Sequence, residues 1–344
     1  EHKIALKIVE KELGSPANIL FDEFPNKPIA SASLGQVYKA KVNSNYYVAV
    51  KVQRPNLDFI IKRDVVILKL LANFLAPFLP LNIGVGIGEI IDEFGRALFE
   101  EINYEKEAIN AERFAKLFKN NPQVIIPKVE KSFSSKKVIT TSWIEGVKLK
   151  DRKEIEQNRL IPSSFIRTGV ISGLQQLFEH GYFHADPHPG NMFALKGGDQ
   201  NNGNIAYVDF GMMDSISDFD RLTLIKAIVH LINNEFLLLA KDFQKLGFLS
   251  EDQDLESLVK PLKEVLGDSL GKEVGNFNFK EITDKFSKLM YDYPFRVPSR
   301  FALIIRAVVS QEGLALRLDP EFKIVKIAYP YIAKKLLTDN SDEI

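Results

Sequence analysis

The segment HADPHPGN, from His184 to Asn191, places an aspartate five residues before an asparagine, and the chain then reaches VDFG at Val208 to Gly211. An Asp-x-x-x-x-Asn loop followed by Asp-Phe-Gly is the spacing of phosphoryl-transfer sites. That chemistry needs a carboxylate to orient or deprotonate the acceptor, and oxygen ligands for the magnesium that bridges the phosphates. We therefore predict Asp186 as the catalytic carboxylate, and Asn191 and Asp209 as magnesium ligands.

The same segment admits a second interpretation, in which its side chains hold a metal. His184, Asp186 and His188 alternate along the chain and could bind zinc or iron in a metal-dependent hydrolase. This alternative leaves Asn191 and the Asp-Phe-Gly motif without a role. We favour phosphoryl transfer, with the two histidines bracing the loop.

A lysine in the amino-terminal part supports phosphate binding. VAVK, Val48 to Lys51, ends an apolar strand on a lysine, which can reach the α- and β-phosphates of a nucleotide. Such a lysine needs an acidic partner. Glu107 is the best candidate, because the alanines beside it in EEINYEKEAINAERF indicate a closely packed helix face. We predict Lys51 and Glu107 as catalytic residues, with Glu100 and Glu101 as alternative partners.

The loop expected to cover the phosphates departs from the usual glycine-rich pattern. Protein kinases carry Gly-x-Gly-x-x-Gly-x-Val, whereas this chain has ASASLGQV, with alanine at the first two glycine positions. A methyl group there restricts positive φ and holds the backbone away from phosphate, so we expect an altered phosphate geometry. The whole loop is predicted to bind nucleotide, namely Ala30, Ser31, Ala32, Ser33, Leu34, Gly35, Gln36 and Val37.

A second nucleotide contact is expected in TTSWIEG, which should connect two lobes and meet the adenine through its backbone. Its predicted cofactor-binding residues are Trp143, Ile144 and Glu145. The alternative is a neighbouring strand that has no ligand contact.

The order of the patterns predicts an α+β fold with two kinase-like lobes. Residues 1–146 form a β-rich lobe with a helical insert at about 57–118, and residues 147–344 form a mainly helical lobe. In the first lobe, PIASASLGQVYKAKV and NYYVAVKVQ are expected to form a hairpin with its turn at Asn43 to Asn45. In the insert, we expect helices from Leu57 to about Leu79 and from about Ile87 to Phe118. QVIIPKVEKSF and KKVITTSWIEG are expected to be two strands joined by a turn at SSKK. After Gly211 the chain should pass almost directly into a helix.

Composition narrows the class of protein. Forty-five basic residues balance forty-five acidic ones among 344, which removes the electrostatic argument for nucleic-acid binding. The chain has no cysteine, so disulfides and thiolate chemistry are excluded. The charge-free run from Leu70 to Gly88 contains prolines and glycines, and we expect a buried helix end and a loop rather than a membrane contact. The chain begins at Glu1 in helical spacing, as expected for a piece of a longer protein.

Together these motifs resemble the UbiB family of atypical protein-kinase-like proteins, also called aarF-domain-containing kinases. PIASASLGQVYKA resembles the alanine-rich loop of that family, VAVKVQRP its lysine strand, HADPHPGN its catalytic loop and VDFGMM its metal motif. RAVVSQEGLALRLDP, Arg306 to Pro320, is similar to its carboxy-terminal signature. The resemblance implies Lys51 and Glu107 as the ion pair, and it places Glu101 at the first position of the family's Glu-x-Asp motif.

The resemblance also implies a biological setting. It suggests binding of ATP or ADP with Mg²⁺, association with membranes, and support of ubiquinone or related prenyl-quinone metabolism. Partners would be membrane lipid, quinone or quinone-biosynthesis proteins, at the cytoplasmic face of a bacterial membrane or in a plastid or mitochondrion. The alternatives are a nucleotide-gated lipid- or quinone-binding pseudokinase and, less well supported by the loop, a small-molecule kinase.

Two features depart from the family pattern. The third position of the Glu-x-Asp motif is Asn103, which removes a charge. The family's Lys-x-Gly-Gln segment does not occur in this sequence, and we expect it upstream of Glu1 in the longer protein.

Overall fold

The structure is a computed structural model that describes residues 2–43, 45–75, 87–198, 203–267, 293 and 295–338. Its contacts divide the chain into two units. Unit 1 comprises residues 1–116, 126–145 and 208–212, and unit 2 comprises residues 117–125, 146–207 and 213–344. The chain therefore crosses from one unit to the other several times.

Unit 1 is built on an antiparallel sheet with strand order β1-β2-β3-β5. Its strands are β1 (Ala30–Ser31), β2 (Gly35–Asn43), β3 (Tyr46–Gln53) and β5 (Val138–Ser142). Side chains alternate along a strand, so Val48, Val50 and Val52 enter the hydrophobic core with α1 (His2–Leu13) and α2 (Ala17–Leu20). Lys51 therefore projects from the opposite face of β3. The predicted hairpin of β2 and β3 is confirmed.

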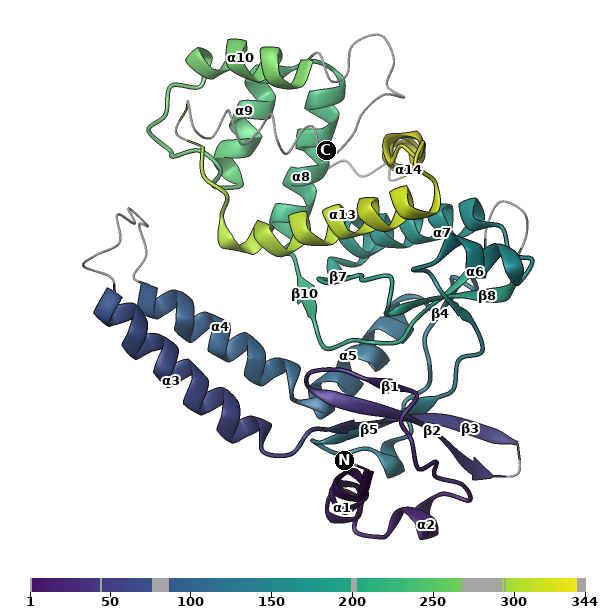
Figure 1. The fold of residues 1–344 in the computed structure, drawn as a ribbon. Coiled ribbons are helices and arrows are strands. Elements are labelled where there is room, and N and C mark those ends of the chain that lie inside the picture. The colour runs from purple at the N-terminus through teal and green to yellow at the C-terminus, as the bar shows by residue number, and fades with distance from the viewer. Residues whose placement is uncertain are drawn as a thin grey trace. The chain divides into compact units, whose positions relative to one another are not determined.

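Three helices follow in unit 1: α3 (Leu57–Leu75), α4 (Ile87–Glu101) and α5 (Tyr104–Leu117). Figure 1 shows α3 and α4 lying side by side, and a Cβ on Gly95 would lie 2.9 Å from the Val65 side chain. Residues 76–86, which hold most of the charge-free run, lie outside the described residues. Of the helices that are described, none is both long enough and apolar enough to span a membrane.

The prediction of one continuous helix from Ile87 to Phe118 is wrong. The chain breaks between α4 and α5, where the Ile102 carbonyl accepts a hydrogen bond from Gln53 Nε2 at 2.5 Å. The Tyr104 amide then donates to the Lys136 carbonyl at 3.1 Å. Both bonds attach the break to residues in or beside the sheet. Helical spacing in the sequence does not reveal them, because their partners are distant along the chain.

Unit 2 contains two small sheets. The first has strand order β4-β9-β8-β6, formed by β4 (Val124–Ile125), β6 (Val147–Lys148), β8 (Met192–Gly198) and β9 (Gly203–Tyr207). The second pairs β7 (Tyr182–His184) with β10 (Met213–Ser215). Only this three-residue strand β10 lies between the Asp-Phe-Gly motif and the next helix, which begins at Asp218, as the predicted near-direct passage requires.

The predicted strand pair of QVIIPKVEKSF and KKVITTSWIEG is confirmed only in part. Val129 forms an isolated antiparallel bridge with Thr141, but the one strand of the first segment, β4, pairs in parallel with β9. Pro122 and Pro127 flank this strand, and proline has no amide hydrogen with which to extend a ladder. The second segment contains β5, which joins the sheet of unit 1.

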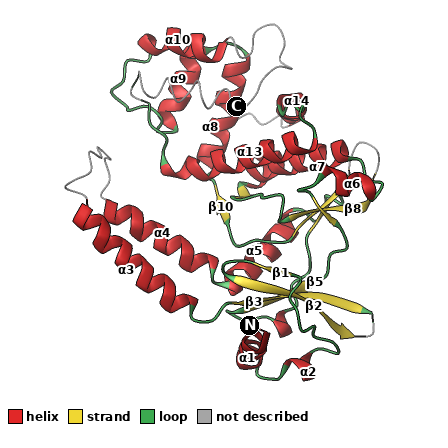
Figure 2. Ribbon diagram, in the orientation of Figure 1, coloured by secondary structure: helices red, strands yellow, loops and turns green. Residues whose placement is uncertain are grey.

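The rest of unit 2 is helical in its described part, as predicted (Figure 2). Its helical segments are α6 (Arg152–Gln157), α7 (Pro162–Gln175), the π-helical turn η3 (Gln176–His180), α8 (Asp218–Ile232), α9 (Phe236–Lys245), α10 (Glu256–Leu262), η4 (Lys263–Gly267), α13 (Ser299–Leu318) and α14 (Val325–Thr338). Helix α7 is the buried centre and packs against β9, α13 and α14. This packing positions the segment that follows α7, which contains HADPHPGN.

Candidate active site

Unit 1 brings a lysine and two carboxylates together. Lys51 Nζ lies 2.9 Å from Glu107 Oε1 and 2.9 Å from Glu107 Oε2, so the predicted ion pair forms. Asp209 joins it, with Oδ2 at 3.4 Å from the same nitrogen. The Glu107 side chain is 3% exposed, whereas Lys51 is 26% and Asp209 34% exposed. Glu107 thus anchors the lysine from inside, and the other two side chains retain accessible surface.

The charges of this cluster depend on one another. Burial acts against the charged form of Lys51, but Asp209 and Glu107 outweigh it and raise the pKa of the ammonium above its ordinary value. Burial raises the pKa of Glu107 to about 7, although Lys51 opposes this shift. Lys51 is therefore a cation at neutral pH.

Helix α5 also holds the Asp-Phe-Gly segment. Asn110 Nδ2 donates to the Phe210 carbonyl at 2.9 Å, and the Phe210 ring lies 5.3 Å from the ring of Phe114. The Gly211 amide donates to Asp209 Oδ1 at 3.0 Å. These contacts fix the backbone from which Asp209 projects.

The predicted site residue Glu101 lies at the end of α4 beside this segment. Its Cγ atom is 3.9 Å from the position that a Cβ on Gly211 would occupy. Asn103, the departure from the family motif, accepts a hydrogen bond from the Lys106 amide at 3.4 Å through Oδ1. Asn103 therefore acts at the start of α5, in the manner of a helix cap.

The alanine-rich loop is held by Arg54, which follows β3. Arg54 Nε donates to the Ala32 carbonyl at 2.9 Å, and its Nη2 donates to Ser31 Oγ at 3.0 Å. The Ala32 amide donates to the Gly35 carbonyl at 2.8 Å, and the Arg54 amide donates to the Leu34 carbonyl at 2.9 Å. Hydrogen bonds from Arg54 thus hold the turn of the loop on both sides.

The residues of this loop that are predicted to contact nucleotide lie on both faces of the unit 1 sheet. Ala30 pairs with Val37, and Val37 pairs with Lys51, so the Val37 side chain shares the face of the lysine. Gln36 lies on the other face, where its Oε1 accepts from Tyr38 Oη at 3.0 Å. Ser33 lies in the turn of the loop. Nucleotide contact by these residues stays a prediction.

The predicted adenine contact at Trp143 to Glu145 lies beyond the end of β5. The Trp143 amide donates to the Tyr47 carbonyl at 3.0 Å, and its indole Nε1 donates to Glu145 Oε1 at 2.9 Å. Lys39 Nζ lies 3.1 Å from Glu145 Oε1 and 4.5 Å from the centre of the Trp143 ring. These two side chains and the Trp143 amide are therefore engaged within unit 1, and Ile144 lies between them. An adenine contact here stays a prediction.

In unit 2, HADPHPGN forms a loop braced by its own histidines. His184 Nδ1 accepts from the Asp186 amide at 3.1 Å, and His188 Nδ1 accepts from the Gly190 amide at 3.0 Å. The Asp186 carbonyl accepts from the His188 amide at 2.7 Å, and the Asn191 amide donates to the His188 carbonyl at 2.8 Å. These hydrogen bonds thus hold the loop backbone at Asp186 and at Asn191, from which both side chains project.

The metal-hydrolase alternative has no support in the described part of the chain. Each histidine of the loop uses its Nδ1 for a loop amide, and no group of three or more His, Asp or Glu side chains there is arranged to hold a metal ion. The bracing role of the two histidines is the one that these hydrogen bonds support.

Several supporting residues were not predicted from the sequence. Beneath the loop, Gln176 Oε1 accepts from the His184 amide at 2.9 Å, and Ser172 Oγ lies 2.7 Å from Tyr207 Oη. Burial raises the pKa of Tyr207 to about 12, so its hydroxyl stays protonated. In unit 1, Arg54 and Asn110 have equivalent supporting roles. Other polar residues surround both Asn110 in AINAER and Gln176 in LQQLFE, so no local sequence signal singles out either one.

Comparison with known proteins identifies the domains. Residues 1–242 match the ABC1 atypical kinase-like domain, and residues 262–323 match the UbiB helical domain. An uncharacterized protein of Synechocystis is 49% identical over 344 residues, which is all of this chain and 60% of that protein. Protein ACTIVITY OF BC1 COMPLEX KINASE 1, chloroplastic, of Arabidopsis thaliana is 42% identical over 339 residues, 98% of this chain and 49% of that protein. The chain thus spans about half to three fifths of these relatives.

A solved structure supports the fold. The Mycobacterium tuberculosis protein Rv3197, in its complex with erythromycin, has a TM-score of 0.68 to this chain at 23% identity. The match covers 93% of this chain and 80% of that one. The predicted α+β kinase-like fold is confirmed, and on the match over residues 1–242 the chain belongs to the ABC1 (UbiB) family of atypical kinase-like proteins.

Proposed function

We propose that this chain binds ATP or ADP with Mg²⁺ and acts as an atypical kinase or ATPase. The Lys51, Glu107 and Asp209 cluster carries the proposal, because one cation lies within 3.4 Å of two carboxylates of very different exposure. The buried Glu107 holds the lysine, while the accessible surfaces of Lys51 and Asp209 suit a phosphate and a magnesium ion. The donor chemistry of the cluster therefore fits a magnesium nucleotide.

The residues have separate roles in this proposal. Lys51 would bind phosphate oxygens and the alanine-rich loop would cover the phosphates, while Asp209 in unit 1 and Asn191 in unit 2 are each proposed as magnesium ligands. Magnesium neutralises charge on the phosphates when it is bound. In transfer, the acceptor oxygen bonds to the γ-phosphorus, the bond from that phosphorus to the bridging oxygen breaks, and ADP leaves. Asp186 takes the proton of the acceptor, which is a hydroxyl for a kinase and water for an ATPase.

Nucleotide-dependent stabilisation tests binding. A ligand at a hundred times its Kd should add about 2.7 kcal/mol to the free energy of unfolding. We expect ATP and ADP with Mg²⁺ to raise the melting temperature of the wild type, and Asp209→Asn to lose the magnesium-dependent part of that rise. Each variant is compared with itself without nucleotide, which removes any effect of the substitution on the unliganded protein. A wild type without any such shift at millimolar nucleotide refutes the proposed site.

Turnover distinguishes an enzyme from a nucleotide-gated binder. If Asp186 accepts the proton, Asp186→Asn should lower the rate of ATP consumption by about 10² to 10⁴ and leave nucleotide-dependent stabilisation largely intact. Equal residual ATP consumption in the variant and the wild type would favour the pseudokinase that binds lipid or quinone.

The biological setting is part of the same proposal and rests on the family resemblance. We propose a role in ubiquinone or related prenyl-quinone metabolism, at a membrane whose lipids or quinone-biosynthesis proteins are the partners. Quantifying prenyl-quinones in cells that lack the protein, with and without restoration of the full gene, tests this role. Unchanged quinone content would exclude it.

A further inference from the structure

The catalytic loop of unit 2 has a charged neighbour that comes from α13. Arg306 Nη2 lies 3.3 Å from Asp186 Oδ2, and the two side chains are 50% and 32% exposed. Residues 262–323 match the UbiB helical domain, so this arginine lies outside the part of the chain that matches the kinase-like domain. A segment from another domain thus contacts the proposed catalytic carboxylate.

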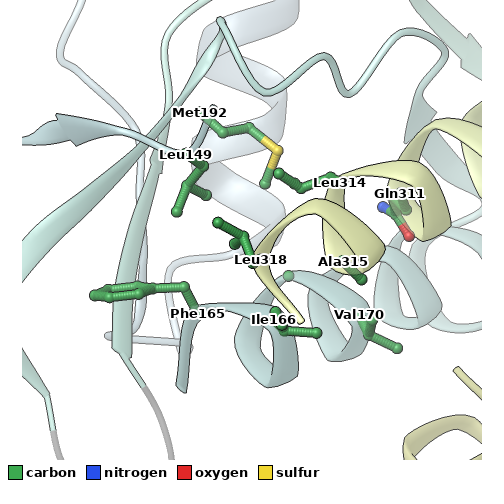
Figure 3. A pocket seen from close by; sticks show the side chains of 10 residues that line it. Leu149, Phe165, Ile166, Val170, Met192, Gln311, Leu314, Ala315 and Leu318 are labelled. Carbon is green, nitrogen blue, oxygen red and sulfur yellow. The ribbon is translucent and has the colours of Figure 1, made fainter. Parts of the chain in front are cut away.

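Helix α13 contacts the loop at more than this one point. Ser310 lies one turn after Arg306 on the same helix face, and its hydroxyl donates to the Pro187 carbonyl at 3.5 Å. Further along, Leu314 and Leu318 line a small apolar hollow together with Met192, the residue that follows Asn191 (Figure 3). The helix therefore runs alongside the loop from Asp186 to the start of β8.

Close packing against α7 fixes the position of α13. A Cβ on Gly173 would lie 2.3 Å from the Gln311 carboxamide, so the Gln311 side chain rests directly on the backbone of α7. Phe165, Ile166 and Val170 of α7 line the hollow opposite Leu314 and Leu318 (Figure 3). Arg306 thus projects from a helix that is anchored on the same element that supports the loop.

We propose that Arg306 is a positioning residue for Asp186, supplied to the active site by the helical domain. An aspartate carboxylate rotates easily about its last torsion, so its backbone hydrogen bonds do not by themselves orient its oxygens. The guanidinium attracts Oδ2 and directs Oδ1 toward the acceptor, which needs a correctly placed base within hydrogen-bond distance. Without Arg306 the carboxylate samples several orientations, and fewer of them are productive.

This proposal rests on the proposed function, so the experiment uses one readout that requires turnover and one that does not. The turnover readout is ATP consumption with Mg²⁺. Arg306→Gln should lower kcat by about tenfold with little change in KM for ATP, since it affects the base rather than nucleotide binding. Arg306→Lys keeps the charge and should recover part of the loss. Arg317→Ala, an exposed arginine on the same helix, is the matched control and should leave kcat unchanged.

A double variant shows whether Arg306 acts through Asp186. In the Asp186→Asn background, Arg306→Gln should cause no further loss, because the carboxylate that it positions is gone. An equal tenfold loss in both backgrounds, or an Arg306→Gln variant with the kcat of the wild type, overturns the proposal.

Hydrogen–deuterium exchange gives the readout that is independent of turnover. The ion pair also ties the loop to α13, so peptides that cover residues 182–192 should exchange faster in Arg306→Gln than in the wild type or in Arg317→Ala. If the wild type consumes no ATP, the proposed function fails, and unchanged exchange in Arg306→Gln would separately overturn the positioning role.

Discussion

At the scale of single residues, Lys51 lowers the free-energy cost of burying the Glu107 carboxylate. The pKa of Glu107 rises from its ordinary value of 4.5 to about 7 in the folded protein, even with Lys51 beside it. Between these pH values the folded state binds more protons than the unfolded state, so this group contributes less stability as the pH rises from 4.5 through 7. Loss of the lysine would raise the pKa of Glu107 further and widen that pH window.

This argument predicts a pH-dependent cost for Lys51→Met. At pH 8 the variant must bury an unpaired carboxylate, and we expect a loss of about 3 kcal/mol in the free energy of unfolding, measured by urea denaturation. At pH 5.5, where Glu107 is protonated in the folded variant, the loss should be clearly smaller. The double variant Lys51→Met/Glu107→Gln serves as the control and should regain part of the stability at pH 8. An equal loss at both pH values would contradict the assigned cause.

At the scale of elements, the start of β2 lies against the start of α5. A Cβ on Gly35 would lie 2.5 Å from Tyr104 Oη and 3.0 Å from the Val52 carbonyl oxygen. Tyr104 is 1% exposed, and its hydroxyl has no hydrogen-bond partner among the residues that the structure describes. Glycine is thus needed here for close approach between a strand and a helix, not for an unusual φ.

We therefore predict that Gly35→Ala destabilises the protein by about 1–3 kcal/mol, as overpacking does. Tyr104→Phe removes the atom that the new methyl group would meet and should be close to neutral alone, because that hydroxyl gains no hydrogen bond. The double variant should be more stable than Gly35→Ala, with part of the strain left from the Val52 carbonyl. Urea denaturation of the three variants measures this, and strictly additive losses would show that the contact is not the cause.

At the scale of the whole molecule, charge balance sets the solution behaviour. Forty-five acidic and forty-five basic residues give a formal net charge of +0 at pH 7 and an isoelectric point of about 7.2. Little electrostatic repulsion then opposes association near neutral pH. We predict that light scattering of the chain at fixed ionic strength is greatest near pH 7.2 and falls at pH 6 and pH 8.5. A monotonic dependence across this range would contradict the prediction.

The structure also shows where sequence patterns mislead at the scale of elements. The hairpin of β2 and β3 and the helices of unit 2 follow periodicities that are local, and they were predicted. The break between α4 and α5 depends on the hydrogen bond from Gln53 to the Ile102 carbonyl. These two residues are 49 positions apart in the sequence. Strand β4 depends likewise on β9, which comes much later in the chain. No local pattern contains either partner.

For the chain as a whole, the sequence by itself determined the kinds of functional group and their order. The spacing of Asp186, Asn191 and Asp209, together with the lysine strand, predicted the kinase-like fold. The alanines beside Glu107 predicted its pairing with Lys51. These signals can be recognised in the sequence because phosphoryl transfer requires particular residue types at fixed separations. Tertiary structure alone decided which residues support them, and Arg306 beside Asp186 is the clearest case. The sequence around Arg306 does not indicate that Asp186 is its partner, because only the packing of α13 on α7 brings the two residues together.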